Sequence, residues 1–165
     1  MAKGGKNKKG DSNAHEPVIE NRRARHDYCI ERSLEVGIVL RGSEVKSVRA
    51  GQVSLGEGYV RAEADPVSLT LHGVHIGEYG PARGINQHTP VRARPLLAHK
   101  REIVKLATDA QAKGSTILPL KMYFKDGRAK LLIGVARGKQ SHDKREDLKT
   151  REAQRDIQRA MSKRV

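Results

Sequence analysis

Alternating apolar and polar residues run through the middle of the chain and predict a protein built mainly of β-strands. The longest such run extends from Tyr28 to Leu40 and is interrupted at Arg32. We expect this long strand to bend, and Gly37 is the residue in it that bends most easily. Three further strand segments are predicted, at residues 44–51, 59–64 and 67–76, the last two joined by a turn at Asp65-Pro66.

The clearest local pattern is a β-hairpin near the end of this region. Apolar residues alternate over 118–124 and again over 129–135, and Asp126-Gly127 between them is a typical hairpin turn. Residues 99–113 have helical spacing instead, and Gly114 is a fitting C-terminal stop. The predicted apolar face of this helix consists of Ile103, Leu106, Ala107 and Ala110.

Several strands with one late helix predict a mainly β fold, a small closed antiparallel barrel of the oligonucleotide-binding (OB) type with flanking helices. An open antiparallel sheet with a helix on one face is the alternative. The expected organisation is a disordered basic arm over 1–20, the barrel over 21–138 with the inserted helix 99–113, and a basic tail over 139–165.

The charge narrows the class of partner. The net charge is +14 and the sequence pI is about 10.2, which favours nucleic acid over the weaker option of an acidic membrane surface. No apolar run approaches the ~18 residues that a membrane span needs. The single cysteine, Cys29, forms no internal disulfide, and its place in a strand pattern predicts a buried thiol. We expect a cytoplasmic protein.

Residues 77–94 have no periodicity, and structureless loops of this length are uncommon unless they are functional. Because the loop contains Arg83, Arg92 and Arg94, we predict that it contacts nucleic acid. A tolerated insertion is the alternative.

Asn21 to Tyr28 combine three arginines with a histidine and a tyrosine, side chains that bind phosphates and stack on bases. Aromatic residues make up only 3% of the chain, which favours a folded RNA recognised by its shape over an extended single strand. No motif of a hydrolase, phosphate-binding loop or metalloenzyme is present, so we expect neither an enzyme nor a cofactor. His72 and His75 are spaced to opposite faces of a strand, which argues against a metal site.

The end of the chain, residues 137–165, contains ten Lys/Arg, five Asp/Glu and few large aliphatic residues. Such a segment has little to build a core with, so we predict that it is disordered when free and becomes helical against a polyanion. A solvated tail without a task is the alternative.

Several blocks resemble the small protein B family, the SsrA-binding proteins. The blocks are residues 21–28, 35–40, 42–51, 99–103, 119–124, 127–130 and 138–145, all in one order along the chain. This resemblance implies a barrel that binds the tRNA-like domain of transfer-messenger RNA. It also implies delivery, with elongation factor Tu and GTP, to ribosomes stalled on messages that lack a stop codon.

In this family the tail occupies the empty message path and the decoding site. By position, Asn21, Glu35 and Leu97 match residues tied to RNA binding. The tail residues that match are His142, placed against decoding-centre bases, and the Asp143-Lys144-Arg145 motif. Adding the basic groups of the first block and of the tail's start gives the candidate RNA-binding set: Asn21, Arg22, Arg25, His26, Glu35, Leu97, Lys139, His142, Asp143, Lys144 and Arg145.

Three places depart from the family pattern. Thr89 and Pro95 stand in changed motifs beside the long loop, and Ser141 replaces a commoner bulky residue. Pro95 removes a positive charge and a backbone donor, which puts a phosphate contact there in doubt. A structural ribosomal protein would share the charge and the arms, and a cold-shock-like chaperone is disfavoured by the shortage of aromatic residues.

Overall fold

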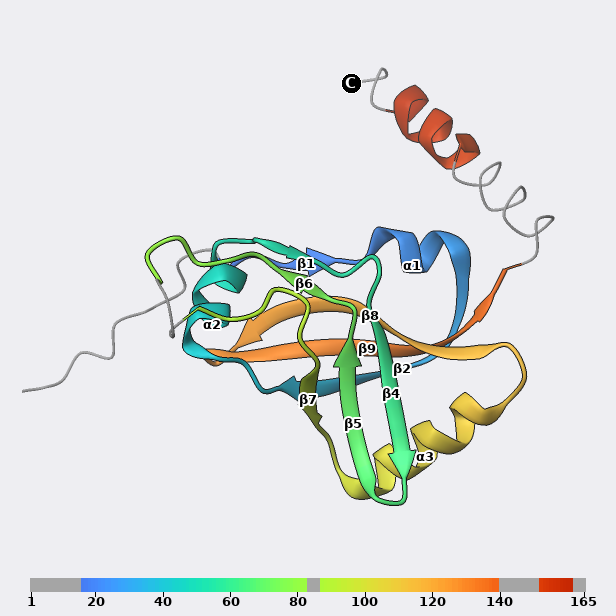
Figure 1. Ribbon diagram of the computed structural model, residues 1–165. Coiled ribbons are helices and arrows are strands. Elements are labelled where there is room, and N and C mark those ends of the chain that lie inside the picture. The colour runs from blue at the N-terminus through green and yellow to red at the C-terminus, as the bar shows by residue number, and fades with distance from the viewer. Residues whose placement is uncertain (1–15, 83–86, 140–151, 162–165) are drawn as a thin grey trace, which may run out of the picture.

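The computed structural model describes residues 16–82, 87–139 and 152–161 and is dominated by antiparallel strands (Figure 1). The body contains β1 (Ile19–Glu20), α1 (Arg22–Asp27), β2 (Tyr28–Ile38), α2 (Gly42–Arg49), β3 (Val53–Ser54), β4 (Tyr59–Ala64), β5 (Val67–His72), β6 (His75–Ile76), β7 (Arg94–Leu97), α3 (Lys100–Gln111), β8 (Ser115–Lys125) and β9 (Arg128–Gly138). Residues 152–161 are helical. Because Ile19 and Glu20 pair with β8, the folded body begins inside the segment that was expected to be a disordered arm.

The main sheet has seven strands in the order β1-β8-β9-β2-β7-β5-β4, and β3 pairs with β6 in a second, two-stranded sheet. The expected closed barrel is therefore wrong. The described residues form an open antiparallel sheet, as in the alternative. Part of the β8 edge that a closing strand would need is already used. Ile19 and Glu20 pair with Met122 and Lys121, and the backbone N–H of Asn21 donates to the carbonyl of Leu120.

The predicted helix and hairpins are confirmed, but the strand expected over 67–76 ends at His72, because Gly73 has a positive φ and His75–Ile76 forms β6 of the second sheet. Helix α3 buries Ile103, Leu106 and Ala107 on one face. β8 and β9 are joined at Asp126-Gly127, where both residues have positive φ, as a tight hairpin turn requires. β4 and β5 are likewise joined at Asp65-Pro66, which has a cis peptide bond.

The strand predicted at the start of 44–51 is wrong, because residues up to Arg49 form helix α2, whereas the turn predicted after it is present at Ala50-Gly51. The buried residues of α2, Glu44, Ser47 and Val48, have helical spacing, i, i+3 and i+4. A Glu44 carboxylate oxygen also accepts a hydrogen bond from the backbone N–H of Arg41, 2.6 Å away, at the start of the helix.

Two β-bulges lie on either side of β9. One interrupts β2 between Ile30 and Arg32, and the other interrupts β8 between Pro119 and Lys121. Gly37, where a bend was expected, is paired with both Leu97 and Lys130, so β2 passes from β9 to β7 at this residue without a break in pairing. A bulge changes which face the following residues point to, so one strand can place apolar side chains on both faces.

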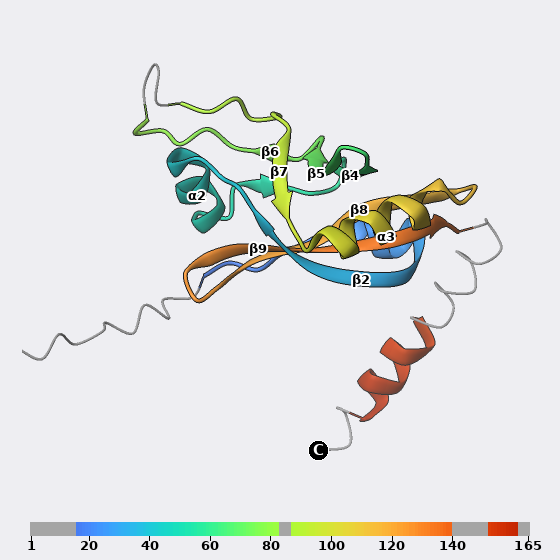
Figure 2. The same ribbon diagram turned by 90° about the horizontal axis from the view of Figure 1, so that it is seen from below.

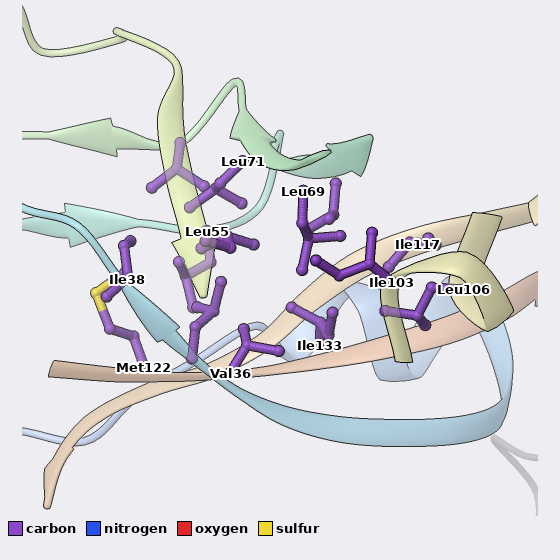
Figure 3. Packing of buried hydrophobic residues seen from close by; sticks show 14 of the residues in the cluster. Val36, Ile38, Leu55, Leu69, Leu71, Ile103, Leu106, Ile117, Met122 and Ile133 are labelled. Carbon is purple, nitrogen blue, oxygen red and sulfur yellow. The ribbon is translucent and has the colours of Figure 1, made fainter. Parts of the chain in front are cut away.

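The main core lies inside the curved sheet, between its β8–β9–β2 part and its β7–β5–β4 part, and α3 closes one end, where Ile103 and Leu106 meet Ile117 and Ile133 (Figure 3). A second apolar cluster lies on the other face, where Ala24 of α1 packs with Leu118, Leu120 and Ala136. Figures 1 and 2 accordingly place α1 and α3 on opposite sides of the β8–β9–β2 part of the sheet.

Candidate nucleic-acid interface

A buried cluster of Glu44, Arg92 and Arg94 fixes the segment from Pro90 to Arg94, which leads into β7. Glu44 is fully buried and accepts hydrogen bonds from Arg92 Nη2 at 2.5 Å and from Arg94 Nε at 2.8 Å. Arg94 is also fully buried and donates to the carbonyls of Val74 at 2.8 Å and Pro90 at 2.9 Å. Arg94 is therefore not available to contact nucleic acid, whereas the Arg92 side chain is 20% exposed, so contact by the rest of the loop stays a prediction. Arg83 lies outside the described residues.

The cluster keeps Glu44 ionised. Burial alone would raise the pKa of Glu44, but hydrogen bonds from Arg92, from the Arg41 backbone and from Arg94 outweigh it, so this pKa lies below its ordinary value of 4.5. His88 fixes the same segment from another side. Its imidazole is buried and lies 2.9 Å from Ser43 Oγ and 3.1 Å from the carbonyl of Ile76.

Asn21 is a buried positioning residue at the start of α1. Its side-chain oxygen accepts from the backbone N–H of Ala24 at 3.0 Å, which caps the helix. Its Nδ2 donates to the carbonyls of Leu55 at 3.0 Å and Pro119 at 2.9 Å. Because these bonds engage both ends of the amide, Asn21 holds α1 against the sheet and does not present its side chain to solvent.

The basic residues of α1 are held at the surface. Arg22, Arg25 and His26 are exposed, and His26 Nδ1 lies 3.0 Å from Asp27 Oδ1. Lys139, at the end of β9, donates from Nζ to the carbonyl of Arg25 at 3.2 Å and from its backbone N–H to the carbonyl of Asp27 at 2.9 Å. The structure thus brings the predicted residues of α1 together with Lys139.

Glu35 stands at the surface among cations. The hydroxyl of Tyr123 donates to Glu35 Oε2, and the ammonium groups of Lys125 and Lys130 lie 3.7 and 3.9 Å from Glu35 Oε1. The bond from Tyr123, opposed by desolvation and reinforced by the two lysines, holds the pKa of Glu35 below 4.5. The same bond raises the pKa of Tyr123 to about 12. Glu35 is therefore an ionised acceptor in a positive setting.

Leu97 is an apolar residue at the surface and is 61% exposed. It lies against Gly37, where an added Cβ would approach its Cβ to 3.3 Å. Together with Phe124 and Lys130 it lines a groove of ≈ 400 Å³. Pro95 shares the outward direction of Leu97 on β7, so this departure from the family pattern lies beside the groove.

A second groove, of ≈ 460 Å³, runs beside α1 and is lined by Arg25, Ile30, Leu132 and Lys139. Leu132 is the ladder partner of Glu35 and lies two residues from Lys130 on β9, so both grooves open on one side of the sheet. We call this side the α1 face: the surface formed by Arg25, Ser33, Glu35, Leu97, Lys130, Leu132 and Lys139. It therefore combines cations, one carboxylate and exposed apolar area.

Cys29 lies at the edge of this second groove and is exposed, so the expected buried thiol is wrong. It is the second residue of β2 and pairs with the exposed Arg137, outside both apolar clusters. Among the described residues no three His, Cys, Asp or Glu gather as metal ligands. Within the same ranges no helix is long and apolar enough to cross a membrane.

The predicted tail residues His142, Asp143, Lys144 and Arg145 lie outside the described residues. The helix over 152–161 is exposed at every position, with Ile157 60% and Met161 68% exposed. Sequence reasoning missed Tyr123, Lys125 and Lys130 because each appears only as a polar position in an alternating strand. Their strand parity was the available signal, since it places all three on the face opposite the core.

A basic protein whose exposed sheet face carries cations, an anchored carboxylate and apolar grooves belongs to the nucleic-acid-binding class. The sequence profile of the SmpB protein family matches residues 18–163. This chain belongs to the SmpB family, and the resemblance read from its sequence is confirmed.

Similar proteins span nearly the whole chain. The SsrA-binding protein of Listeria welshimeri is 51% identical over 147 residues, 89% of this chain and 94% of that protein. The SsrA-binding protein of Chloroflexus aggregans is 50% identical over 148 residues, 90% of this chain and 92% of its own. A solved structure described as "tmRNA-SmpB: a journey to the center of the bacterial ribosome" has 46% identity and a TM-score of 0.64, and covers 76% of this chain and 86% of that one.

Proposed function

We propose that this protein binds the tRNA-like domain of transfer-messenger RNA and delivers that RNA to stalled ribosomes. Membership of the SmpB family over residues 18–163 is the observation that carries the proposal. The similar structure is described as tmRNA-SmpB in the bacterial ribosome, which supports the same two partners. The reaction served would be trans-translation, in the cytoplasm, with elongation factor Tu and GTP acting through the RNA complex.

The α1 face is the surface that we assign to transfer-messenger RNA. Arg22, Arg25, His26 and Lys139 are placed to contact phosphates, since they gather around α1 with their charges outward. Glu35 accepts hydrogen bonds from ribose hydroxyl or base amino groups, which an ionised carboxylate does well. Leu97 gives an unstacked base or a ribose an apolar surface, and Asn21 acts indirectly by fixing α1.

The tail has a separate task in this proposal. It is disordered in the free protein and becomes helical along the empty message path, with His142 and the Asp143-Lys144-Arg145 motif at the decoding site. Residues 152–161 are already helical in the structure, but Ile157 and Met161 are exposed, so no packing on the body would hold this helix in the free protein. Along ribosomal RNA, its cations would release counterions on binding.

Truncation after Lys139, which keeps this residue of the α1 face in the body, tests this division of labour. We expect affinity for the isolated tRNA-like domain, measured by fluorescence anisotropy, to stay within a few-fold of the full chain. Peptide tagging in a translation reaction programmed with a message lacking a stop codon should be lost. A collapse of RNA affinity would contradict the assignment of RNA binding to the body. Failure of the full chain to bind this RNA at all would refute the proposed function.

A further inference from the structure

A further cleft lies beside α1 and shares Tyr28 with the groove lined by Arg25 and Lys139. It has a volume of ≈ 250 Å³ and opens between α1 and the turn over 56–58. Its lining is mostly polar and includes Arg23, Tyr28, Glu57, Tyr59 and Thr116. The volume is below the roughly 300–1,000 Å³ of sites for drug-sized ligands, so the cleft suits one small planar group.

Arg23 stands at this cleft between two carboxylates. Its Nη1 donates to Glu57 Oε1, and its Nε lies 3.6 Å from Asp27 Oδ2. The side chains of Arg23 and Glu57 are 65% and 78% exposed, so water competes with their ion pair. Exposed pairs of this kind are weak, and an incoming phosphate can replace the carboxylate at little cost.

Tyr59 offers an aromatic surface at the same cleft. Its ring stacks on the imidazole of His72 with centroids 5.2 Å apart and an angle of 14° between the planes. Tyr59 is nevertheless 49% exposed, because the stack covers one side of the ring. A ring held in this way is ready for a second planar partner and loses little side-chain entropy when it binds one.

The walls of the cleft are fixed by the backbone. An added Cβ at Gly58 would lie 2.5 Å from Val74 Cγ2 and 2.8 Å from Pro119 Cγ, so the turn packs tightly on the sheet. On the other side, Asn21 ties α1 to Leu55 and Pro119. Because both walls are held, the backbone positions from which Arg23 and Tyr59 reach the cleft are fixed relative to each other.

We propose that this cleft is a nucleotide subsite. An unstacked base of the bound RNA lies on Tyr59, and the phosphate of the same nucleotide replaces Glu57 as the ion-pair partner of Arg23. The proposal rests on the proposed function, since it needs a bound RNA. Glu57 then acts as a charge that holds Arg23 in the free protein and competes with phosphate. An arginine that binds phosphate and a ring that stacks on a base are the two contacts that unpaired nucleotides receive.

A double-mutant cycle at Arg23 and Glu57 tests the exchange. Affinity for the tRNA-like domain transcript is measured from 50 to 300 mM salt, with the same series on small ribosomal subunits to assign the nucleotide to one RNA or the other. We expect Arg23→Gln to reduce the slope of log affinity against log salt by about 0.7–0.9, the value for one phosphate. Glu57→Gln should tighten binding about three- to fivefold, the scale of an exposed ion pair.

The matched control is Glu63→Gln, which breaks a similar exposed pair with Arg61 at 2.8 Å on the β4–β5 hairpin. It should change affinity less than twofold. In the Arg23→Gln background, Glu57→Gln should also have less than a twofold effect. An undiminished gain there would mean that Glu57 acts through its general field and would overturn the exchange, as would an unchanged salt slope in Arg23→Gln.

Tyr59 is tested with two substitutions, both checked for an unchanged melting temperature. Tyr59→Leu should weaken binding about fivefold or more, the lower range for losing one stacked base, whereas Tyr59→Phe should stay within twofold. Equal RNA affinity of the wild type, Tyr59→Leu and Tyr59→Phe would refute the proposal that a base stacks on Tyr59 in this cleft. Because wild-type binding is measured beside every variant, loss of the subsite is distinguishable from failure of the proposed function, in which the wild type binds neither RNA.

Discussion

Replacing Glu44 with glutamine removes the negative charge that Arg92 and Arg94 share in the interior. Glu44 and Arg94 are both fully buried, and Arg94 is held on further sides by the carbonyls of Val74 and Pro90. Glutamine keeps the shape, but one carboxylate oxygen becomes an amide that faces guanidinium donors. Arg94 cannot leave its site, so it would remain charged and only partly paired.

The magnitude follows from this burial. Removing one partner of a buried pair costs about 3–5 kcal/mol, because the other charge stays uncompensated. The Arg92 side chain is 20% exposed and can turn to water, so we expect the lower end, about 3 kcal/mol of the free energy of unfolding. For a domain of this size, that loss corresponds to a fall in Tm of roughly 10 °C.

Urea unfolding at pH 7 measures the effect, with Glu63→Gln as the matched control. The Arg61–Glu63 pair has a similar distance, 2.8 Å, but its side chains are 68% and 36% exposed. Its loss should therefore cost no more than about 0.5–1 kcal/mol. An equal loss in the free energy of unfolding for the two substitutions would refute the argument that the Glu44 cluster stabilises the fold because it is buried.

The pH dependence gives an independent check. The folded pKa of Glu44 lies below 4.5, so the unfolded chain binds this proton more tightly than the folded protein. The stabilisation by Glu44 is complete above the unfolded pKa and is lost as the pH falls through the folded one. Wild type should thus lose stability below about pH 4.5, and the gap to Glu44→Gln should narrow there. A gap that is independent of pH would contradict the ionised state of Glu44.

Four further outcomes are expected. Tyr123→Phe should raise the pKa of Glu35, seen by NMR titration of the carboxyl, whereas Glu35→Ala should weaken RNA binding about tenfold; tighter binding would mean that Glu35 only repels phosphate. Ile157→Pro should leave the Tm of the body unchanged but reduce tagging, and normal tagging would make the helix over 152–161 dispensable. Gly58→Ala should lower the free energy of unfolding by about 1–3 kcal/mol in urea, because its Cβ would lie 2.5 Å from Val74 Cγ2; an unchanged midpoint would mean that the turn relaxes freely.

The sequence predicted correctly those helices and strands whose apolar residues follow a regular local spacing. Helix α3 and the β8–β9 hairpin were both predicted, since their apolar spacing, Gly114 and Asp126-Gly127 agree. Helix α2 was missed because its eight residues are mostly polar and include two valines, which favour strands. What selects the helix is burial of Glu44 beside Arg94, a residue fifty positions further along the chain that no local pattern links to it.

The bulges limited the prediction in the same way. The alternation over 118–124 predicted one apolar face, but the bulge after Pro119 sends Leu118 and Leu120 to the α1 side and leaves Met122 in the main core. The break at Arg32 was visible in the sequence as an interruption of alternation. Its consequence, a change of face, depends on pairing with β9 and could not be read from one strand.

The candidate site was predicted in part for a related reason. Basic residues that stand together in the sequence, such as those of α1, remain together in the structure, whereas Glu35, Leu97 and Tyr123 meet only through strand register. The resemblance supplied Glu35 and Leu97 by position without their setting. The cations beside Glu35 explain how a carboxylate can lie on a surface that is assigned to RNA.

The two bulges also explain why the α1 face is not simply a charged surface. Because they let β2 and β8 carry apolar residues on both sides, α1 can pack on Leu118 and Leu120 while α3 covers the main core. The apolar floor that extends past α1, at Ile30 and Leu132, is the remainder of that second packing surface. Packing α1 in place therefore creates the grooves beside its cations, and the same contacts that fold the protein lay out the surface on which we place the RNA.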